Sequence, residues 1–470
     1  MIPLSLDEIA RATGARLDGG ADPAAVVTGP VVIDSRRVSP GGLFAAVEGE
    51  RVDGHDYAAT ARAAGAVAML GTRPAGVPAL IVDDVPGALA KLAQEAVARL
   101  PQVTIAGLTG SAGKTSTKDL TAQLVERLGP TISPEGSYNN EFGFPLTVLR
   151  ADEQTRFMVL ELAARGPGHI AFLCEIAPPR VGAVLNVGHA HTGEFGGIEQ
   201  VARAKGELPA ALPAATAGGV AILNADDHRV RAMASRTEAR IVTFGLDGAD
   251  FTATGVRLDE LGRPSFTLIT PAGSAPVQMQ LHGAHQVPNA LAAAAIAAEL
   301  GLDPGGIADG LSTATARSRW RMEVQQAPGG VTVINDAYNA NPESVRAALD
   351  ALGHLARGRR SFAVLGQMAE LGEESRDSHL EAGEHAAGTG VAGLIVVGKE
   401  AEPILDGALA TSGWHGEAIG VPDIPAAIAA LRGRLNAGDV VLVKASRAAG
   451  LERVAAELLS QPPSEKETAQ

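Results

Sequence analysis

The chain has 470 residues and a formal net charge of −14, and 46% of its residues are apolar. Because this length exceeds one ordinary core, we expect about two to four domains. The acidic balance disfavours a nucleic-acid-binding surface, which would need a basic stripe to neutralise phosphates, but it allows a local site for a small polyanion. The single cysteine, Cys174, excludes an internal disulfide framework.

The first residues of the chain do not have the charged and then apolar pattern of a signal peptide. No apolar run reaches the ~18 residues that indicate a membrane span. We therefore expect a soluble, cytoplasmic protein that does not span a membrane and does not bind nucleic acid.

Residues 1–86 are predicted to form a first, small α/β domain. Helices are expected at 6–13 and 57–64, a strand with a polar turn at 31–38, and short strands at 43–47, 66–70 and 79–82. Pro86 is typical of a first helical turn, so a connecting helix is predicted to follow it, at 88–100.

The second predicted unit, residues 87–316, contains a glycine-rich turn between a strand at 103–106 and a helix at 118–128. The turn reads Gly110-Ser111-Ala112-Gly113-Lys114-Thr115, a compact phosphate loop in which Leu108 replaces the usual first glycine. Backbone N–H groups and a helix N-terminus cradle phosphates in such loops. Lys114 would reach the terminal phosphates and Thr115 would bind Mg²⁺. The alternative is a glycine-rich turn with an incidental Lys-Thr pair.

Polar residues follow two further predicted strands of this unit, at 157–162 and 181–187. Glu161 lies at the end of the first, and His191 follows the second. Ligands of open α/β sheets bind beyond the carboxyl ends of the strands, so both side chains are candidate Mg²⁺ ligands. An ordinary loop histidine is the alternative for His191, and His189 is the weaker candidate.

The rest of the second unit carries weaker signals. Lys205 is predicted on a helix, where the residue pattern by itself favours a solvated surface lysine. Residues 221–227 again have the pattern of a short apolar strand that ends in polar residues. The alternation of apolar and polar residues at 251–281 predicts an antiparallel insert. The Ala-rich helix predicted at 289–300 must pack closely against a neighbour.

The third predicted unit, residues 317–470, alternates buried strands with helices, which predicts a parallel sheet. Strands are expected at 331–335, 361–365, 393–397 and 440–444, and the polar tail after Ser460 is expected to be disordered.

Polar loops follow three of these strands. Asp336, Asn339 and Asn341 supply acceptors and amides after the first strand, although an Asx-rich turn would use the same residues. The roles of the loops at 365–372 and 444–447 are equally undecided by the residue pattern. The loop at 444–447 either binds anions or is an ordinary basic turn.

Together these motifs resemble the Mur ligases, which are ATP-dependent amide ligases of peptidoglycan precursor synthesis. The resemblance spans nearly the whole chain, and the segment Asp336 to Pro342 is the most specific, because it is similar to the dipeptide-adding branch. The other matching segments are Asp34-Ser35-Arg36 with Pro40-Gly41, Thr109 to Thr117, Tyr138 to Thr147, His191, Phe195-Gly196, and Ala204 to Glu207.

The resemblance implies an α/β protein of three domains: a uridine-binding domain at 1–86, a central ATP-binding domain with a parallel sheet at 87–316, and a Rossmann-like domain at 317–470. It implies ATP and Mg²⁺ as cofactors and UDP-N-acetylmuramoyl-tripeptide and D-alanyl-D-alanine as substrates. The product would serve cell wall biogenesis, cell shape and cell division. We expect a monomer.

The resemblance also implies site residues. The catalytic residues would be Lys114, Glu161, His191 and Lys205. The ATP site would comprise Thr109, Gly110, Ser111, Ala112, Gly113, Lys114, Thr115, Ser116, Asn289, Arg321 and Asp336. The substrates would contact Ser35, Arg36, Asn139, Asn140, Tyr338, Asn339 and Asn341. The metal ligands would be Thr115, Glu161, His191 and a carbamylated Lys205.

Two residues depart from the family pattern, because Gln286 replaces an Asn and Gln367 replaces an Asp. Three alternatives remain open: a Mur-type ligase that adds a single amino acid, a ligase similar to folylpolyglutamate synthase, and a non-catalytic nucleotide-binding regulator. The third residue of the tripeptide, diaminopimelate or lysine, is not determined by the sequence.

Overall fold

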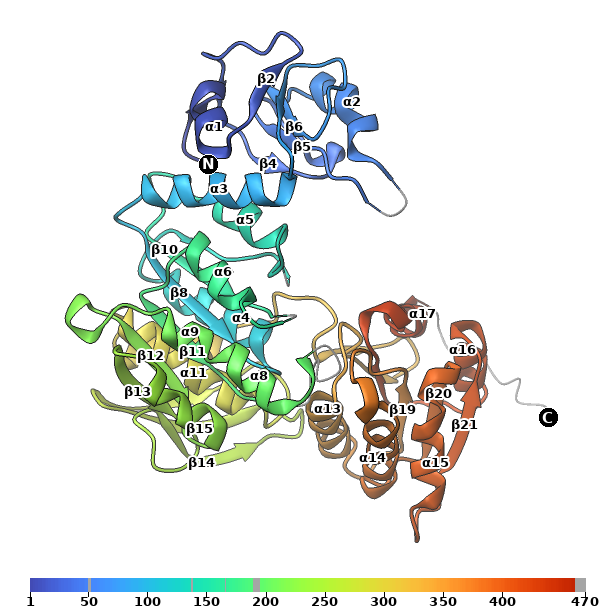
Figure 1. Cartoon of the computed structure of the whole chain (residues 1–470). Coiled ribbons are helices and arrows are strands. Elements are labelled where there is room, and N and C mark those ends of the chain that lie inside the picture. The colour runs from blue at the N-terminus through green and yellow to red at the C-terminus, as the bar shows by residue number, and fades with distance from the viewer. Residues whose placement is uncertain (50–51, 137, 165, 189–194, 461–470) are drawn as a thin grey trace.

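The computed structural model describes residues 1–49, 52–136, 138–164, 166–188 and 195–460, so the tail after Ser460 lies outside the described residues. The described residues form three α/β domains that follow one another along the chain (Figure 1). Each domain is built around its own sheet, of five, six and six strands respectively.

The N-terminal domain begins with α1 (Leu6–Thr13), at the predicted position, and Ser5 and Glu8 form a capping box at its start. The sheet has mostly parallel strands in the order β2 (Arg16–Asp18), β7 (Ala79–Ile81), β6 (Ala68–Gly71), β5 (Leu43–Ala45) and β4 (Val31–Val32). The other elements are a small pair of strands, β1 (Leu4–Ser5) and β3 (Val26–Val27), and the helix α2 (Ala58–Ala63).

The predicted strand at 31–38 is shorter than expected, because β4 ends at Val32. The side chain of Asp34 accepts a hydrogen bond from the Arg36 backbone N–H and starts a 3₁₀ turn, η1 (Ser35–Arg37). An Asp that caps the following turn competes with strand extension.

The helix α3 (Val85–Ala98) connects the first domain to the second, with Pro86 in its first turn as predicted. It packs against α1 on one side and against α5 (Gly143–Val148) and α6 (His169–Ile176) of the central domain on the other (Figure 1).

The central sheet is parallel throughout its described residues. Its strand order is β13 (Arg240–Phe244), β12 (Val220–Asn224), β11 (Val181–Val184), β8 (Thr104–Thr109), β10 (Phe157–Glu161) and β9 (Thr131–Ile132). Two apolar clusters cover its two faces. This arrangement brings the carboxyl ends of β8, β10 and β11 to one edge, as a shared ligand site requires.

The helices α4 (Lys114–Val125) and α11 (Gln286–Glu299) pack against each other on one face of the central sheet. Six consecutive residues of α11, from Ala292 to Ala297, are fully buried, which confirms the close packing predicted for the Ala-rich helix. The predicted antiparallel insert is also present, as β14 (Thr252–Leu258), β15 (Pro264–Thr270) and β16 (Gly273–Gln278). The remaining central helices are α8 (Ile198–Lys205), α9 (Glu207–Ala210), α10 (His228–Ala232) and α12 (Pro304–Thr313).

The C-terminal sheet has the strand order β17 (Glu323–Gln326), β18 (Thr332–Asn335), β22 (Val440–Lys444), β19 (Ser361–Leu365), β20 (Gly393–Val397) and β21 (Glu417–Val421). The four predicted strands, β18, β22, β19 and β20, run parallel, which confirms the predicted parallel sheet, and β21 is parallel as well. The strand β17 was not predicted and is an antiparallel edge strand. Its helices are α13 (Pro342–Leu355), α14 (Ser375–Gly388), α15 (Glu402–Ala410), α16 (Ile424–Arg432) and α17 (Glu452–Ser460). None of the helices in the described ranges is long and apolar enough to cross a bilayer.

Candidate active site

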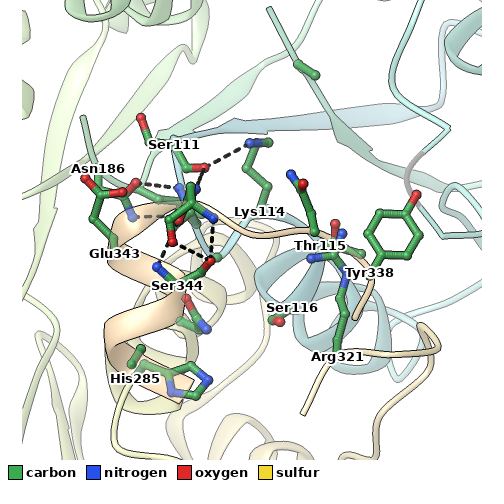
Figure 2. Close-up of a pocket in the computed structure, with 18 of the residues that line it drawn as sticks. Ser111, Lys114, Thr115, Ser116, Asn186, His285, Arg321, Tyr338, Glu343 and Ser344 are labelled. Carbon is green, nitrogen blue, oxygen red and sulfur yellow. Dashed lines mark hydrogen bonds between the residues drawn. The ribbon is translucent and has the colours of Figure 1, made fainter. Parts of the chain in front are cut away.

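A cavity of about 840 Å³ lies between the central and C-terminal domains. The central domain contributes the turn after β8 and the ends of β10 and β11, and the C-terminal domain contributes the loops after β18, β19 and β22 (Figure 2). The predicted site residues that line it are Ser111, Ala112, Gly113, Lys114, Thr115, Ser116, Asn139, Asn140, Glu161, Asn289, Arg321, Asp336, Tyr338, Asn339 and Asn341.

The glycine-rich turn connects β8 directly to α4, which begins at Lys114 rather than at the predicted residue 118. Gly113 is the N-cap residue, with φ of +79°, and a Cβ there would lie 2.4 Å from Asn289 Oδ1. Only glycine fits this position, and it brings no side chain to cap the helix. The first residues of α4, Lys114, Thr115 and Ser116, line the cavity, so the N-terminus of this helix lies where an anion site is predicted.

Asn186, which follows β11, holds the turn in shape. Its Oδ1 accepts a hydrogen bond of 2.8 Å from the Ala112 N–H, and its Nδ2 donates one of 3.1 Å to the Ala112 carbonyl. The Asn186 carbonyl also accepts a hydrogen bond from the Ser111 N–H. This role of Asn186 was not predicted, although its position at the end of a strand was a signal for it.

Lys114 lies folded over the turn, and its Nζ donates a hydrogen bond of 2.7 Å to the Gly110 carbonyl. Burial lowers the pKa of its ammonium group, the Glu161 carboxylate opposes this shift, and the Arg321 charge adds to it. Cations from two domains thus converge where phosphates are predicted to bind.

Thr115 and Glu161, both predicted as metal ligands, are in direct contact. The Thr115 hydroxyl donates a hydrogen bond of 2.9 Å to Glu161 Oε2, and Asn139 Nδ2 donates one of 2.6 Å to Glu161 Oε1. Glu161 is only 1% exposed. The neighbouring Asn140 has a structural contact, since its Oδ1 accepts the Gly143 N–H at the start of α5.

Lys205 is the last residue of α8 and is 4% exposed, so the solvated surface position favoured by the residue pattern was wrong. Burial, with a contribution from the Lys114 charge, lowers the pKa of its amine well below the usual value. The Glu207 carboxylate accepts N–H groups at the start of α6, from Gly168 and Ala171, which anchors the segment after Lys205.

His191, the remaining predicted metal ligand, lies outside the described residues, as does His189. Within the described ranges, no group of three His, Cys, Asp or Glu side chains is arranged to hold a metal ion. Of the predicted metal ligands, the described residues that supply oxygen atoms are Thr115, through its hydroxyl, and Glu161, through its carboxylate.

The C-terminal side of the cavity is organised by an ion pair between Lys444 and Asp336, with 2.6 Å between Nζ and Oδ2. The Met322 N–H donates to the other oxygen of Asp336, and Lys444 Nζ also donates to the Asn339 carbonyl. Asp336 therefore supports its own loop, and one of the two basic residues of the 444–447 segment is neutralised within the protein.

Asn341 connects the two sides of the cavity. It forms a capping box with Ser344 at the start of α13, and its Nδ2 donates a hydrogen bond of 3.4 Å to the Ser111 carbonyl. In Figure 2 the start of α13, with Glu343 and Ser344, lies beside the glycine-rich turn. The Asn341 side chain is thus used as a cap and as a link between domains.

Arg321 and Tyr338 approach the cavity from the same side (Figure 2). The Arg321 guanidinium lies 4.3 Å from the centre of the Tyr338 ring, Trp320 stacks on that ring, and Arg447 lies 4.3 Å from the centre of Trp320. Trp320 was not predicted as a site residue, and Arg447 belongs to the segment for which an anion site and a basic turn were both considered. Alternating cations and aromatic rings hold both arginines in place.

The remaining predicted site residues lie at the edges of the site or away from it. Asn289 accepts from Thr117 and donates to Gln286, one of the two departures from the family pattern. The buried Thr109 hydroxyl has no hydrogen-bond partner among the described residues. Ser35 and Arg36 lie in η1 of the first domain and do not line the cavity, and Arg36 forms an ion pair with Asp34.

Fold and site define a three-domain α/β enzyme with a glycine-rich turn between a strand and a helix in the wall of the described cavity. Three family models match the chain in succession: the Mur ligase family catalytic domain at residues 30–105, the Mur ligase middle domain at 108–297, and the Mur ligase glutamate ligase domain at 320–447. The chain belongs to the Mur ligase family.

Individual relatives match the chain over nearly its whole length. It is 47% identical to the UDP-N-acetylmuramoyl-tripeptide–D-alanyl-D-alanine ligase of Mycobacterium tuberculosis, with 98% of each chain covered. It is 36% identical to the Escherichia coli ligase of the same name, over 97% of this chain and 98% of the other.

Solved structures agree. MurF from Acinetobacter baumannii has a TM-score of 0.85 and 30% identity, over 98% of this chain and 99% of the other. MurF ligase from Thermotoga maritima, solved in complex with ADP, has a TM-score of 0.77 and 32% identity, over 92% of this chain and 97% of the other.

Proposed function

We propose that this protein is an ATP-dependent ligase that joins D-alanyl-D-alanine to UDP-N-acetylmuramoyl-tripeptide during peptidoglycan precursor synthesis. One observation carries the proposal: the phosphate loop and the loop from Asp336 to Pro342 face each other across one cavity, where Asn341 contacts Ser111. The names of the relatives that share 47% and 36% of their residues with the chain support it.

The reaction proceeds in two chemical steps. A terminal carboxylate oxygen of the tripeptide attacks the γ-phosphorus of ATP, and ADP leaves, which yields an acyl phosphate. The dipeptide amine then attacks the acyl carbon, and the tetrahedral intermediate loses phosphate and one proton to give the amide. The N–H groups at the start of α4 and the Lys114 ammonium stabilise charge on the transferred phosphoryl group.

The donors around Glu161 fit Mg²⁺. A hydroxyl and a carboxylate are hard oxygen ligands, and Thr115 and Glu161 already place theirs in contact. Bound there, the ion would offset the negative charge of the phosphates. His191 and a carbamylated Lys205 complete the proposed ligand set.

Burial of Lys205 supports the carbamylation, because carbon dioxide reacts with a neutral amine and not with an ammonium group. The lowered pKa of Lys205 favours the neutral form. The amine nitrogen forms a bond to the carbon of CO₂ and releases one proton, which leaves an anionic carbamate with two oxygens.

The other assignments stay proposals. Ser35 and Arg36 hold the uridine of the substrate in the 1–86 domain. Residues 87–316 bind ATP through the phosphate loop, with Asn289 on the same domain and Arg321 and Asp336 from the 317–470 domain. The peptide substrates contact Asn139, Asn140, Tyr338, Asn339 and Asn341. A cytoplasmic location and a monomeric state remain predictions.

Release of ADP tests the proposed function. Purified protein is supplied with ATP, Mg²⁺ and UDP-tripeptides that end in diaminopimelate or lysine, with D-Ala-D-Ala or with single amino acids. We expect ADP and amide only with the dipeptide. Amide formation with a single amino acid would favour another ligase of the family, and nucleotide binding without phosphate release would favour a regulator.

A further inference from the structure

The linker into the C-terminal domain is attached to the phosphate-loop helix, α4. Gln123 Nε2 donates to the Thr315 carbonyl and Gln123 Oε1 accepts the Thr315 N–H, both at 3.0 Å. The Ser318 N–H donates to the buried Asp119 carboxylate at 3.0 Å, and Arg317 forms a two-contact ion pair with Glu126. We call residues 315–318 the linker seat.

The three side chains that hold the linker seat come from one face of α4 and its C-cap residue, Glu126. Asp119, Gln123 and Glu126 are spaced four and then three residues apart, which places them above one another on a helix. Asp119 is itself fixed by an ion pair with Lys118, whose Nζ also donates to the Pro134 carbonyl. One rigid helix therefore presents the phosphate loop at its first turn and the linker seat along its later turns.

The chain reaches Arg321 only three residues after the linker seat. Trp320 and Met322, on either side of Arg321, have φ of +60° and +50°, a left-handed conformation that non-glycine residues rarely adopt. Stacking on Tyr338 holds Trp320, and the Asp336 carboxylate holds the Met322 N–H. Little conformational freedom thus remains between the linker seat and the guanidinium.

Arg321 is close enough to Lys114 for its charge to lower the pKa of that ammonium. Both side chains line the cavity, one from each domain. Through its hydrogen bonds to α4 and its covalent continuation to Arg321, the linker seat therefore fixes the position of Arg321 relative to the phosphate loop.

We propose that Gln123 and Glu126, together with Asp119, are positioning residues that set Arg321 against the bound nucleotide. Because the linker seat is attached to α4, the segment that leads into Arg321 starts at a point that is fixed relative to the glycine-rich turn. The effect on ligation rests on the proposed function, whereas the effect on ADP binding does not.

A double-mutant cycle tests this inference. It combines changes at Gln123 and Glu126, which hold the linker seat, with a change at Arg321. The Gln123→Ala/Glu126→Gln variant is expected to bind ADP and to use ATP, by kcat/KM, about tenfold less well than the wild type, a coupling typical of residues in one network. In the Arg321→Ala background the same two changes are expected to have no further effect. If Gln123 and Glu126 had a merely structural role, the two changes would instead reduce ADP binding by the same factor in the wild type and in the Arg321→Ala variant.

Two further variants keep the test decisive. Glu417→Gln removes a similar two-contact ion pair, with Arg434, at the edge of the C-terminal sheet, and should leave ADP binding unchanged. The charge swap Glu126→Arg/Arg317→Glu should recover most of the ADP affinity that Glu126→Gln loses. Wild-type affinity in Gln123→Ala/Glu126→Gln, or additive losses in the cycle, would overturn the inference. Coupled losses in ADP binding without amide formation by the wild type would support the inference and refute the proposed function.

Discussion

The Lys444 ammonium lies 2.6 Å from the Asp336 carboxylate, and the two residues, 108 positions apart in the chain, hold together the C-terminal wall of the cavity. The side chain of Lys444 is 2% exposed and that of Asp336 is 14% exposed. Removal of one partner would leave the other charge buried and unpaired, which costs about 3–5 kcal/mol in such sites.

We therefore expect Lys444→Met to lower the free energy of unfolding of the C-terminal domain by about 3 kcal/mol, measured by urea denaturation. The matched control is Lys399→Met, which changes an exposed lysine. Equal stability of the two variants would show that the ion pair contributes little.

Lys114→Ala is expected to abolish amide formation and to leave binding of the UDP-tripeptide largely intact. The reason is that the phosphate loop lines the cavity, whereas Ser35 and Arg36 lie on another domain and do not. Titration calorimetry with the UDP-tripeptide measures the binding. Loss of that binding in a folded Lys114→Ala protein would contradict the division of labour between domains.

Lys205→Ala is expected to be nearly inactive, because the variant lacks the carbamate that is proposed to ligate Mg²⁺. Short-chain carboxylates should restore part of the activity, since they replace the missing anion in the space that the buried side chain leaves. The measurement is ADP release over a series of formate and acetate concentrations. Wild-type activity without added carboxylate would refute the carbamylation.

Binding of ligands is expected to close the molecule. The residues proposed to bind ATP come from the central and C-terminal domains and line one cavity, so a bound nucleotide and UDP-tripeptide should draw the domains together. Small-angle scattering with an ATP analogue and the UDP-tripeptide should give a smaller radius of gyration than the free protein. An unchanged radius would leave closure without support.

His379 gives the C-terminal domain a defined dependence on pH. Its ring is fully buried, accepts the Met368 N–H at Nε2 and contacts the Ser375 carbonyl through Nδ1. Burial lowers the pKa of this histidine, and the contact with Ser375 opposes the shift. Below about pH 6.5 the unfolded chain takes up a proton that the folded state still excludes. The free energy of unfolding therefore decreases as the pH is lowered.

His379→Gln should therefore show a flatter loss of stability between about pH 7 and 5 than the wild type, because an amide does not titrate in this range. Urea denaturation at a series of pH values measures the slope, and His415→Gln, at an exposed position, is the control. Equal slopes for the wild type and His379→Gln would contradict the assignment.

Local patterns in the sequence were sufficient to predict the glycine-rich turn between a strand and a helix, and several of the buried strands. The order strand, Gly110 to Thr115, helix depends on neighbouring residues only, and so do the apolar runs that became β19, β20 and β22 at their predicted positions. The edge strands β17 and β21 were missed because neither forms a continuous run of large apolar residues: β17 is mostly polar, and β21 begins with Glu417 and is interrupted by Gly420.

Only the tertiary structure decided the environment of the chemical groups. Lys205 looks like a surface residue in the sequence, and its burial depends on elements that pack around α8. The pairing of Lys444 with Asp336 and the attachment of Arg317 to Glu126 join residues more than 100 positions apart. Burial and partners of this kind follow from the packing of whole domains, which no window of local sequence contains.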